Sequence, residues 1–178
     1  RIYHASGSLR SSFEDSAKDW RDKTVLAFSV DEISEIDITA GKWSGTFVRK
    51  ANTSETDRTK EKAAGAGDNA AAMVWNTADG RIIESGIMDP LLQSLSELSC
   101  QEFLQTEPDS ASTTVALTVS LKGNREYQIQ LQKEQDGDTT RYTGTSSLVS
   151  QPFEMPAYTV EELIRKVEAL FKPEETGD

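Results

Sequence analysis

The sequence predicts an α+β fold built from two similar units, each with a β-hairpin, a further strand and one amphipathic helix. Two segments alternate apolar and polar residues around a glycine-containing turn, which is the pattern of a hairpin with one buried face. After each hairpin and one more short apolar segment, apolar residues recur every three or four positions, as on one face of a helix. We therefore expect antiparallel sheets that carry one amphipathic helix each.

The first unit is expected within residues 1–106, after a polar and serine-rich lead-in. Ile36 and Ile38 alternate with polar residues and predict one strand, and a return strand follows a glycine-containing turn. The segment 52–71 lacks large apolar side chains, so we expect a long polar loop there. Loops of that length inside a compact domain are often mobile or functional. The segment 72–77 is the next predicted strand.

The second unit is expected within residues 107–178. The cleanest alternation of apolar and polar residues lies at 115–121, and a return strand is expected over 127–131. A third strand is predicted over 142–148, where Gly144 should weaken it. Because each unit is too small to bury its apolar face alone, we expect the two to share a core, as two packed lobes or as one compact domain.

Both predicted helices have recognisable first turns. Asp89 and Pro90 are expected to begin the first helix, because aspartate caps free N–H groups and proline is tolerated at the first helical position. Its apolar face is expected over 91–98. Thr159 and Glu162 match a capping box and are predicted to start the second helix.

The charge of the chain excludes some classes of partner. Lys and Arg total 19 against 30 Asp and Glu, which gives a net charge of −11. An acidic surface repels phosphate backbones and anionic lipids, so we do not expect nucleic-acid binding or docking on such lipids. No apolar run in the sequence approaches the length of a membrane span, so direct membrane insertion is not expected.

Few residues are candidates for chemistry. His4, the only histidine, lies in the polar lead-in and is interpreted as a surface residue rather than a catalytic base. Cys100 has acidic neighbours in the sequence and is interpreted as a structural thiol, because a reactive thiolate needs a positive environment. The carboxylates around Gly137 are interpreted as a hairpin turn, since an EF-hand also needs flanking helices. We assign no catalytic residue, cofactor or metal.

Three parts of the sequence resemble a bacterial family known as domain of unknown function 4340. They are the tryptophan-Arg-Asp-Lys opening and the apolar alternation after it (20–38), Met-Val-Trp followed by the Leu-rich segment (73–98), and Pro-Phe before the last helix (152–171). The resemblance implies an envelope protein with an N-terminal membrane anchor, in some members encoded near ABC transport systems. It supplies no catalytic residues. The sequence starts at Arg1 rather than methionine, which fits the anchor that the resemblance implies but does not decide whether one was removed.

The resulting hypothesis is a non-enzymatic accessory or binding module of a bacterial cell-envelope complex, with a protein partner in the envelope and a possible ABC-transport link. We expect it to be periplasmic and membrane-anchored at full length, with a cytoplasmic location as the alternative. Trp43 and Trp75, on the exposed face of the sheet, and the loop 52–71 are the expected interaction surface. Two alternatives remain: a small-ligand binder with an aromatic-lined cleft between the units, and a carboxylate-dependent hydrolase with raised carboxyl pKa values.

Overall fold

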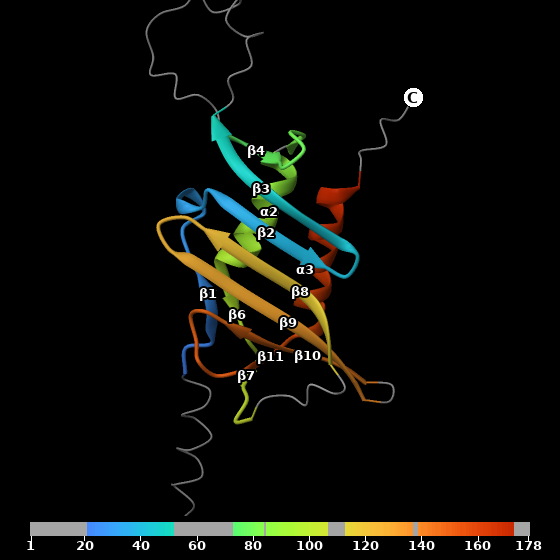
Figure 1. Cartoon of the computed structure of the whole chain (residues 1–178). Helices are drawn as coiled ribbons and strands as arrows, with labels where there is room; N and C mark the ends of the chain where they lie inside the picture. The colour runs from blue at the N-terminus through green and yellow to red at the C-terminus, as the bar shows by residue number, and fades with distance from the viewer. Residues whose placement is uncertain (1–20, 52–72, 84, 107–112, 137–138, 173–178) are drawn as a thin grey trace, which may run out of the picture.

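Strands dominate the structure. The computed structural model describes residues 21–51, 73–83, 85–106, 113–136 and 139–172 (Figure 1). Within these residues, nine strands form one sheet in which every neighbouring pair is antiparallel. In order across the sheet, the strands are β5 (Ile82–Ile83), β4 (Met73–Thr77), β3 (Trp43–Ala51), β2 (Glu35–Ala40), β8 (Thr113–Lys122), β9 (Glu126–Asp136), β10 (Thr139–Ser146), β11 (Phe153–Met155) and β7 (Glu102–Phe103).

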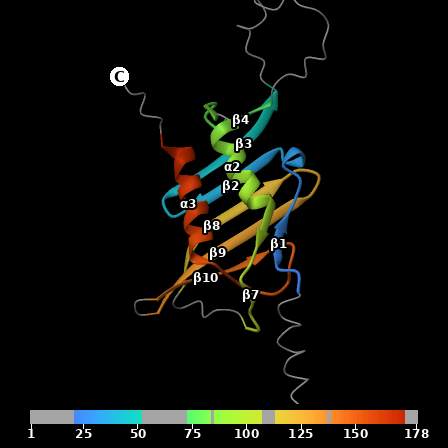
Figure 2. The same ribbon diagram turned by 180° about the vertical axis from the view of Figure 1, so that it is seen from behind.

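Helices cover one face of this sheet and leave the other open. The covering elements are α2 (Ser85–Ser96), α3 (Ala157–Phe171), the 3₁₀ helix η1 (Val30–Glu32), and an antiparallel ribbon made of β1 (Thr24–Ala27) and β6 (Glu97–Ser99). Both long helices lie behind the sheet in Figure 1 and in front of it in Figure 2. Val25 and Leu26 of the ribbon are fully buried in the same core as the helices. The fold therefore has two layers.

The core lies between the two layers and follows from the periodicity of each element. Along β2 and the second half of β8 every second side chain is buried, and along the two helices buried side chains recur mostly at every third or fourth position. Each buried aliphatic side chain stabilises the fold by about 1.5–3 kcal/mol. The most completely buried members are Val25, Leu26, Ile33, Ile36, Ile38, Phe47, Met88, Leu91, Leu92, Leu95, Leu117, Val119, Leu121, Ile129, Leu131, Phe153, Val160, Leu163 and Val167.

The predicted fold class is confirmed at the level of an α+β protein with antiparallel pairing. The arrangement differs from the expected separate sheets, because strands from both halves of the chain form a single sheet. The halves meet where β2 pairs with β8, in the register Glu35↔Lys122. Within the described residues, no helix is long and apolar enough to span a bilayer. The predicted loop 52–71, His4 and Gly137 lie outside the described residues.

The predicted boundaries of the first helix are wrong at both ends. Helix α2 begins at Ser85, one turn before Asp89, and Pro90 lies inside it. A proline this early in a helix disrupts only one intrahelical hydrogen bond, so Asp89-Pro90 does not mark the start. The helix ends at Ser96, and Leu98 instead pairs with Leu26 in the ribbon. Tertiary pairing thus overrides the helical periodicity of this segment.

The predicted capping box of the second helix is also wrong. Helix α3 begins at Ala157, directly after Pro156, so Thr159 lies within its first turn and has no capping role. The Thr159 amide donates to the Pro156 carbonyl at 3.1 Å. Glu162 forms an ion pair with Lys166 one turn further on, at 2.9 Å.

Gly144 is required for packing, whereas the sequence suggested only a weakened strand. A Cβ atom at this position would lie 2.6 Å from Leu131 Cδ2 and 2.8 Å from Phe153 Cε2. Phe153 belongs to β11, a strand that the sequence did not predict, and it pairs directly with Gly144. The missing side chain therefore makes room for the Phe153 ring against β10.

Candidate functional site

The open face of the sheet is made mainly of hydroxyl, amide and charged side chains. It faces the viewer in Figure 1. The alternation that buries Ile36 and Ile38 turns their neighbours outward, and strand pairing aligns the outward residues in rows. The uncharged polar residues on this open face are Thr39, Ser44, Thr46, Asn76, Thr118, Ser120, Gln128, Gln130, Gln132, Thr143 and Thr145.

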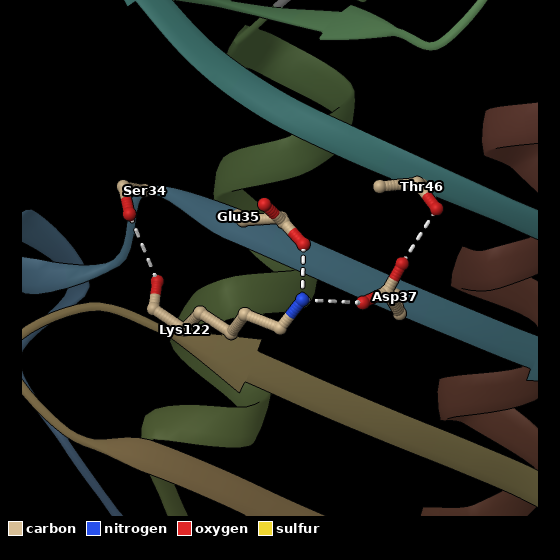
Figure 3. Close-up of polar contacts among 5 residues, drawn as sticks. All are labelled: Ser34, Glu35, Asp37, Thr46 and Lys122. Atoms are coloured by element: carbon tan, nitrogen blue, oxygen red, sulfur yellow. Dashed lines mark hydrogen bonds and ion pairs between the residues drawn. The ribbon is translucent and has the colours of Figure 1, made fainter.

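A cluster of five residues, which we call the seam cluster, lies on the open face where β2 meets β8 (Figure 3). Lys122 Nζ lies 2.5 Å from Glu35 Oε1 and 3.6 Å from Asp37 Oδ2. Thr46 Oγ1 donates to Asp37 Oδ1 at 2.5 Å. Ser34 donates to the Lys122 carbonyl through its amide at 2.8 Å and its hydroxyl at 3.1 Å. Both halves of the chain thus contribute to this cluster.

The seam cluster holds a fixed charge rather than a proton-transfer group. The hydrogen bond to Glu35, its negative charge and that of Asp37 raise the pKa of Lys122 above its ordinary value. Lys122 therefore stays an ammonium group at neutral pH and cannot act as a base. Across the described ranges, no group of three or more His, Cys, Asp or Glu side chains is arranged to hold a metal ion.

A second ion pair lies on the same face, near the edge of the sheet that ends in β7. Arg141 of β10 pairs with Glu154 of β11, whose side chain is only 14% exposed. The hydrogen bond to Glu154 and its negative charge raise the pKa of Arg141. Thr143, which is the strand partner of Glu154, is 2% exposed, and its hydroxyl has no hydrogen-bond partner. This edge of the open face is therefore more desolvated than the seam cluster.

Trp43 and Trp75 do not lie on the open face, so that expectation is wrong. Trp75 is 3% exposed and belongs to the core. Trp43 stacks on Phe171 of α3, with ring centroids 5.7 Å apart and planes 19° apart. The physical reason is register, because Trp43 pairs with the buried Ala40 and Trp75 pairs with the buried Ile83. Both rings therefore lie on the side of the sheet that the helices cover.

The acidic side chains give no support to a carboxylate-dependent hydrolase. In the described part of the chain, the carboxyls whose pKa departs clearly from its ordinary value are Asp22, Asp79 and Glu162, and each pKa is lowered. Hydrogen bonds from Thr24, Thr77 and Lys166, respectively, are the main causes. A general acid would need the opposite shift.

Cys100 is buried, with 5% of its surface exposed. Its amide donates to the Lys23 carbonyl at 2.8 Å, which fixes the backbone beside β1. Burial raises the pKa of the thiol. These properties describe a structural thiol rather than a nucleophile.

A hollow of about 320 Å³ lies on the helical side, between α2 with β6 and the first half of α3. Lys166 crosses it and donates to Ser94 Oγ at 2.6 Å. Glu97 and Glu162 line its walls, and Tyr158 is the aromatic residue in its lining. The hollow is thus charged, unlike the aromatic-lined cleft expected between the two units.

The sequence contained only part of the signal for these sites. Glu35 and Asp37 are visibly two residues apart in an alternating strand, which predicts that they share a face. Their partner Lys122 is 87 residues from Glu35 in the chain, and only the β2–β8 register brings it there. The pairing of Arg141 with Glu154 depended on the unpredicted strand β11.

Comparisons with known proteins gave one match. A family model described as domain of unknown function (DUF4340) matches residues 1–117, which is 117 of the 178 residues of the chain. The matched range includes β2, β3 and the start of β8, and it therefore contains four of the five residues of the seam cluster. Neither the curated proteins nor the solved structures contain a match.

Proposed function

Since the chain belongs to the DUF4340 family, whose description assigns no activity, we propose that it is a non-enzymatic binding module of a bacterial cell-envelope complex. In this proposal the open face of the sheet contacts a protein partner. The envelope location, the membrane anchor at full length and the link to an ABC transport system rest on family membership alone.

The observation that carries the proposed binding role is the breadth of the open face. The six strands from β4 to β10 span about 24 Å, at about 4.8 Å per strand spacing. Along the strand direction, the open face is roughly 20–35 Å long, because each residue adds about 3.4 Å. The product, roughly 500–800 Å², is comparable with the ~800 Å² that one partner contributes to a standard protein interface.

The side chains of this face are also held in place before any partner binds. Lys122 is fixed between two carboxylates, and Thr46 holds one of these carboxylates from β3. Because these side chains are already ordered, binding a partner loses less side-chain conformational entropy. Charged groups of this kind contribute mostly to specificity and association rate.

We also propose that the two halves arose by duplication. Each half contributes a run of consecutive antiparallel strands followed by one helix, β2-β3-β4 with α2 and β8-β9-β10 with α3. The two runs meet edge to edge at the antiparallel pair β2–β8, which is the arrangement expected of two units related by an approximate twofold axis. The seam cluster would then mark the junction between them.

The two alternatives have less support. Small-molecule sites are mostly apolar and have volumes of about 300–1,000 Å³, whereas the hollow beside α3 is charged and lies near that lower limit. A hydrolase would require raised carboxyl pKa values, and those that depart clearly in the described residues are lowered.

Site-specific photo-cross-linking of the full-length protein in its native host tests the proposal. A photoreactive residue at Thr39 or Gln128, both exposed on the open face, should cross-link to one envelope protein. The same residue at Arg165, exposed on α3, should not cross-link to that protein. Cross-linking only from Arg165, or equally from all three positions, would contradict a role for the open face.

A pair of charge reversals gives an independent measurement of the same surface. Lys122→Glu places a third carboxylate beside Glu35 and Asp37 and should lower recovery of the cross-linked partner severalfold. Arg165→Glu makes the same change in charge on the opposite layer and should leave recovery unchanged. Equal effects of both variants would indicate a response to net charge alone.

A further inference from the structure

The charged hollow between α2, β6 and α3 has a floor and a rim of different chemistry. Leu98 and Leu163 form an apolar floor and are 4% and 1% exposed. Tyr158 is 73% exposed at the rim, the highest exposure among the large apolar and aromatic side chains of the described residues. The volume of about 320 Å³ has room for about ten water molecules at ~30 Å³ each, which is enough for one long side chain.

The charges in the hollow are unequally compensated. Lys166 is satisfied, because Glu162 lies 2.9 Å from its Nζ and Ser94 Oγ lies 2.6 Å from it. The Ser94 hydroxyl in turn donates to the Pro90 carbonyl at 2.9 Å, so it has no further proton to offer. Glu97 is exposed and forms no ion pair within the described part of the chain. Among the described residues, the lining therefore keeps one negative charge that no ion pair compensates.

We propose that this hollow binds an arginine side chain presented by an extended segment of a partner protein. The guanidinium group would pair with Glu97 and stack on the exposed Tyr158 ring, and the aliphatic stem would cover Leu98 and Leu163. An anionic ligand would be repelled by Glu97, because the charge of Glu162 is paired with Lys166. A wholly apolar ligand would remove the carboxylate of Glu97 from water without a partner.

The start of α3 bears on this proposal, because a helix N-terminus carries a partial positive charge. That charge opposes a cation beside Tyr158 in the first turn of α3. Glu162 in the next turn offsets it, and Glu97 reaches the hollow from β6, on the opposite wall. The site lies on the helical layer, so it does not depend on the open face being the surface used in the proposed function.

A titration of the isotope-labelled chain with acetyl-Gly-Arg-Gly-amide, followed by amide chemical shifts, tests the proposal. We expect shift changes confined to residues 94–99 and 158–166, with a Kd in the millimolar range that is appropriate to one side chain. The matched peptide with citrulline in place of arginine keeps the shape without the charge and should produce no saturable change. A lysine peptide should bind more weakly, because an ammonium group does not stack on a ring as guanidinium does.

Two pairs of variants separate the proposed contacts from general charge effects. Glu97→Gln should weaken binding of the arginine peptide about threefold to fivefold, whereas Glu161→Gln, an equal charge change outside the lining, should not. Tyr158→Leu should weaken binding and Tyr158→Phe should retain it. Equal binding of the citrulline peptide, equal effects of the two glutamate variants, or shifts spread over the open face would overturn the proposal.

Discussion

The sharpest test of the packing is the addition of one methyl group at Gly144. In Gly144→Ala the new Cβ would lie 2.6 Å from Leu131 Cδ2, 2.8 Å from Phe153 Cε2 and 2.9 Å from the Gln130 carbonyl oxygen. Leu131 and Phe153 are fully buried, and the third neighbour is backbone, so none of the three can move without disturbing the core or the sheet. Steric relief must therefore come from the strands themselves.

The expected cost is at the upper end of the range for overpacked cores. Such substitutions usually destabilise by about 1–3 kcal/mol, and three contacts below 3.0 Å favour a value of ~3 kcal/mol. In a chain of this size, each kcal/mol of lost stability lowers Tm by about 2–4 °C, so a loss of ~3 kcal/mol should lower Tm by roughly 6–12 °C. Urea unfolding followed by circular dichroism gives the free energy of unfolding directly.

A second substitution and a matched control make the reasoning refutable. Phe153→Leu removes the ring that the new methyl group meets, so the double variant with Gly144→Ala should be less destabilised than the sum by about 1 kcal/mol or more. Gly86 lies in α2, and nothing lies within 4 Å of the position that a Cβ atom would occupy there, so Gly86→Ala should stabilise by about 0.5–1 kcal/mol. A change below about 0.5 kcal/mol in Gly144→Ala, or strict additivity with Phe153→Leu, would refute the steric account.

Three further predictions follow from burial and charge. Thr143→Val replaces a buried hydroxyl that has no hydrogen-bond partner with a methyl group. In urea unfolding, the free energy of unfolding should stay unchanged or rise by up to about 1 kcal/mol. A loss above ~1 kcal/mol would mean that the hydroxyl has a partner. Cys100 should react with a disulfide reagent far more slowly in the native than in the denatured protein, because it is buried. As a control, the exposed cysteine of Ser99→Cys in a Cys100→Ser background should react quickly in the native protein. Equal rates for the two native cysteines would contradict the burial of Cys100. Because Lys166 lowers the pKa of Glu162, their ion pair stabilises the fold at pH values above the ordinary carboxyl pKa. This contribution should be lost as the pH falls through the lowered pKa of Glu162. An NMR titration of Glu162 should therefore give a lower midpoint in the native chain than in Lys166→Met.

Local patterns in the sequence were sufficient to predict the strands β2, β8 and β9 and the helix α3. In each, the period of the apolar residues matches the geometry of the element, and the buried face is the one that the period selects. Prediction was weaker where two elements compete for one segment. Leu98 continues the apolar spacing of α2, yet its pairing with Leu26 draws it into the ribbon.

The candidate sites were less predictable, because they depend on which strands become neighbours. Alternation shows that Glu35 and Asp37 share a face, but it does not show that Lys122 lies between them. Trp43 was placed on the wrong face for a related reason. A tryptophan among small and polar residues suggests exposure, and only the position of Phe171 on α3 shows what covers it.

The central strand pair has a consequence for how the chain folds. Strands β2 and β8 join residues 35–39 to residues 118–122, so the middle of the sheet cannot close until most of the chain is available. Contacts so distant in sequence carry a large loop-closure entropy, and sheets dominated by them fold in milliseconds to seconds rather than microseconds. During synthesis, the edge of β2 would remain unpaired until β8 has emerged from the ribosome. The nascent first half is therefore the stage at which this protein most needs protection from edge-to-edge association.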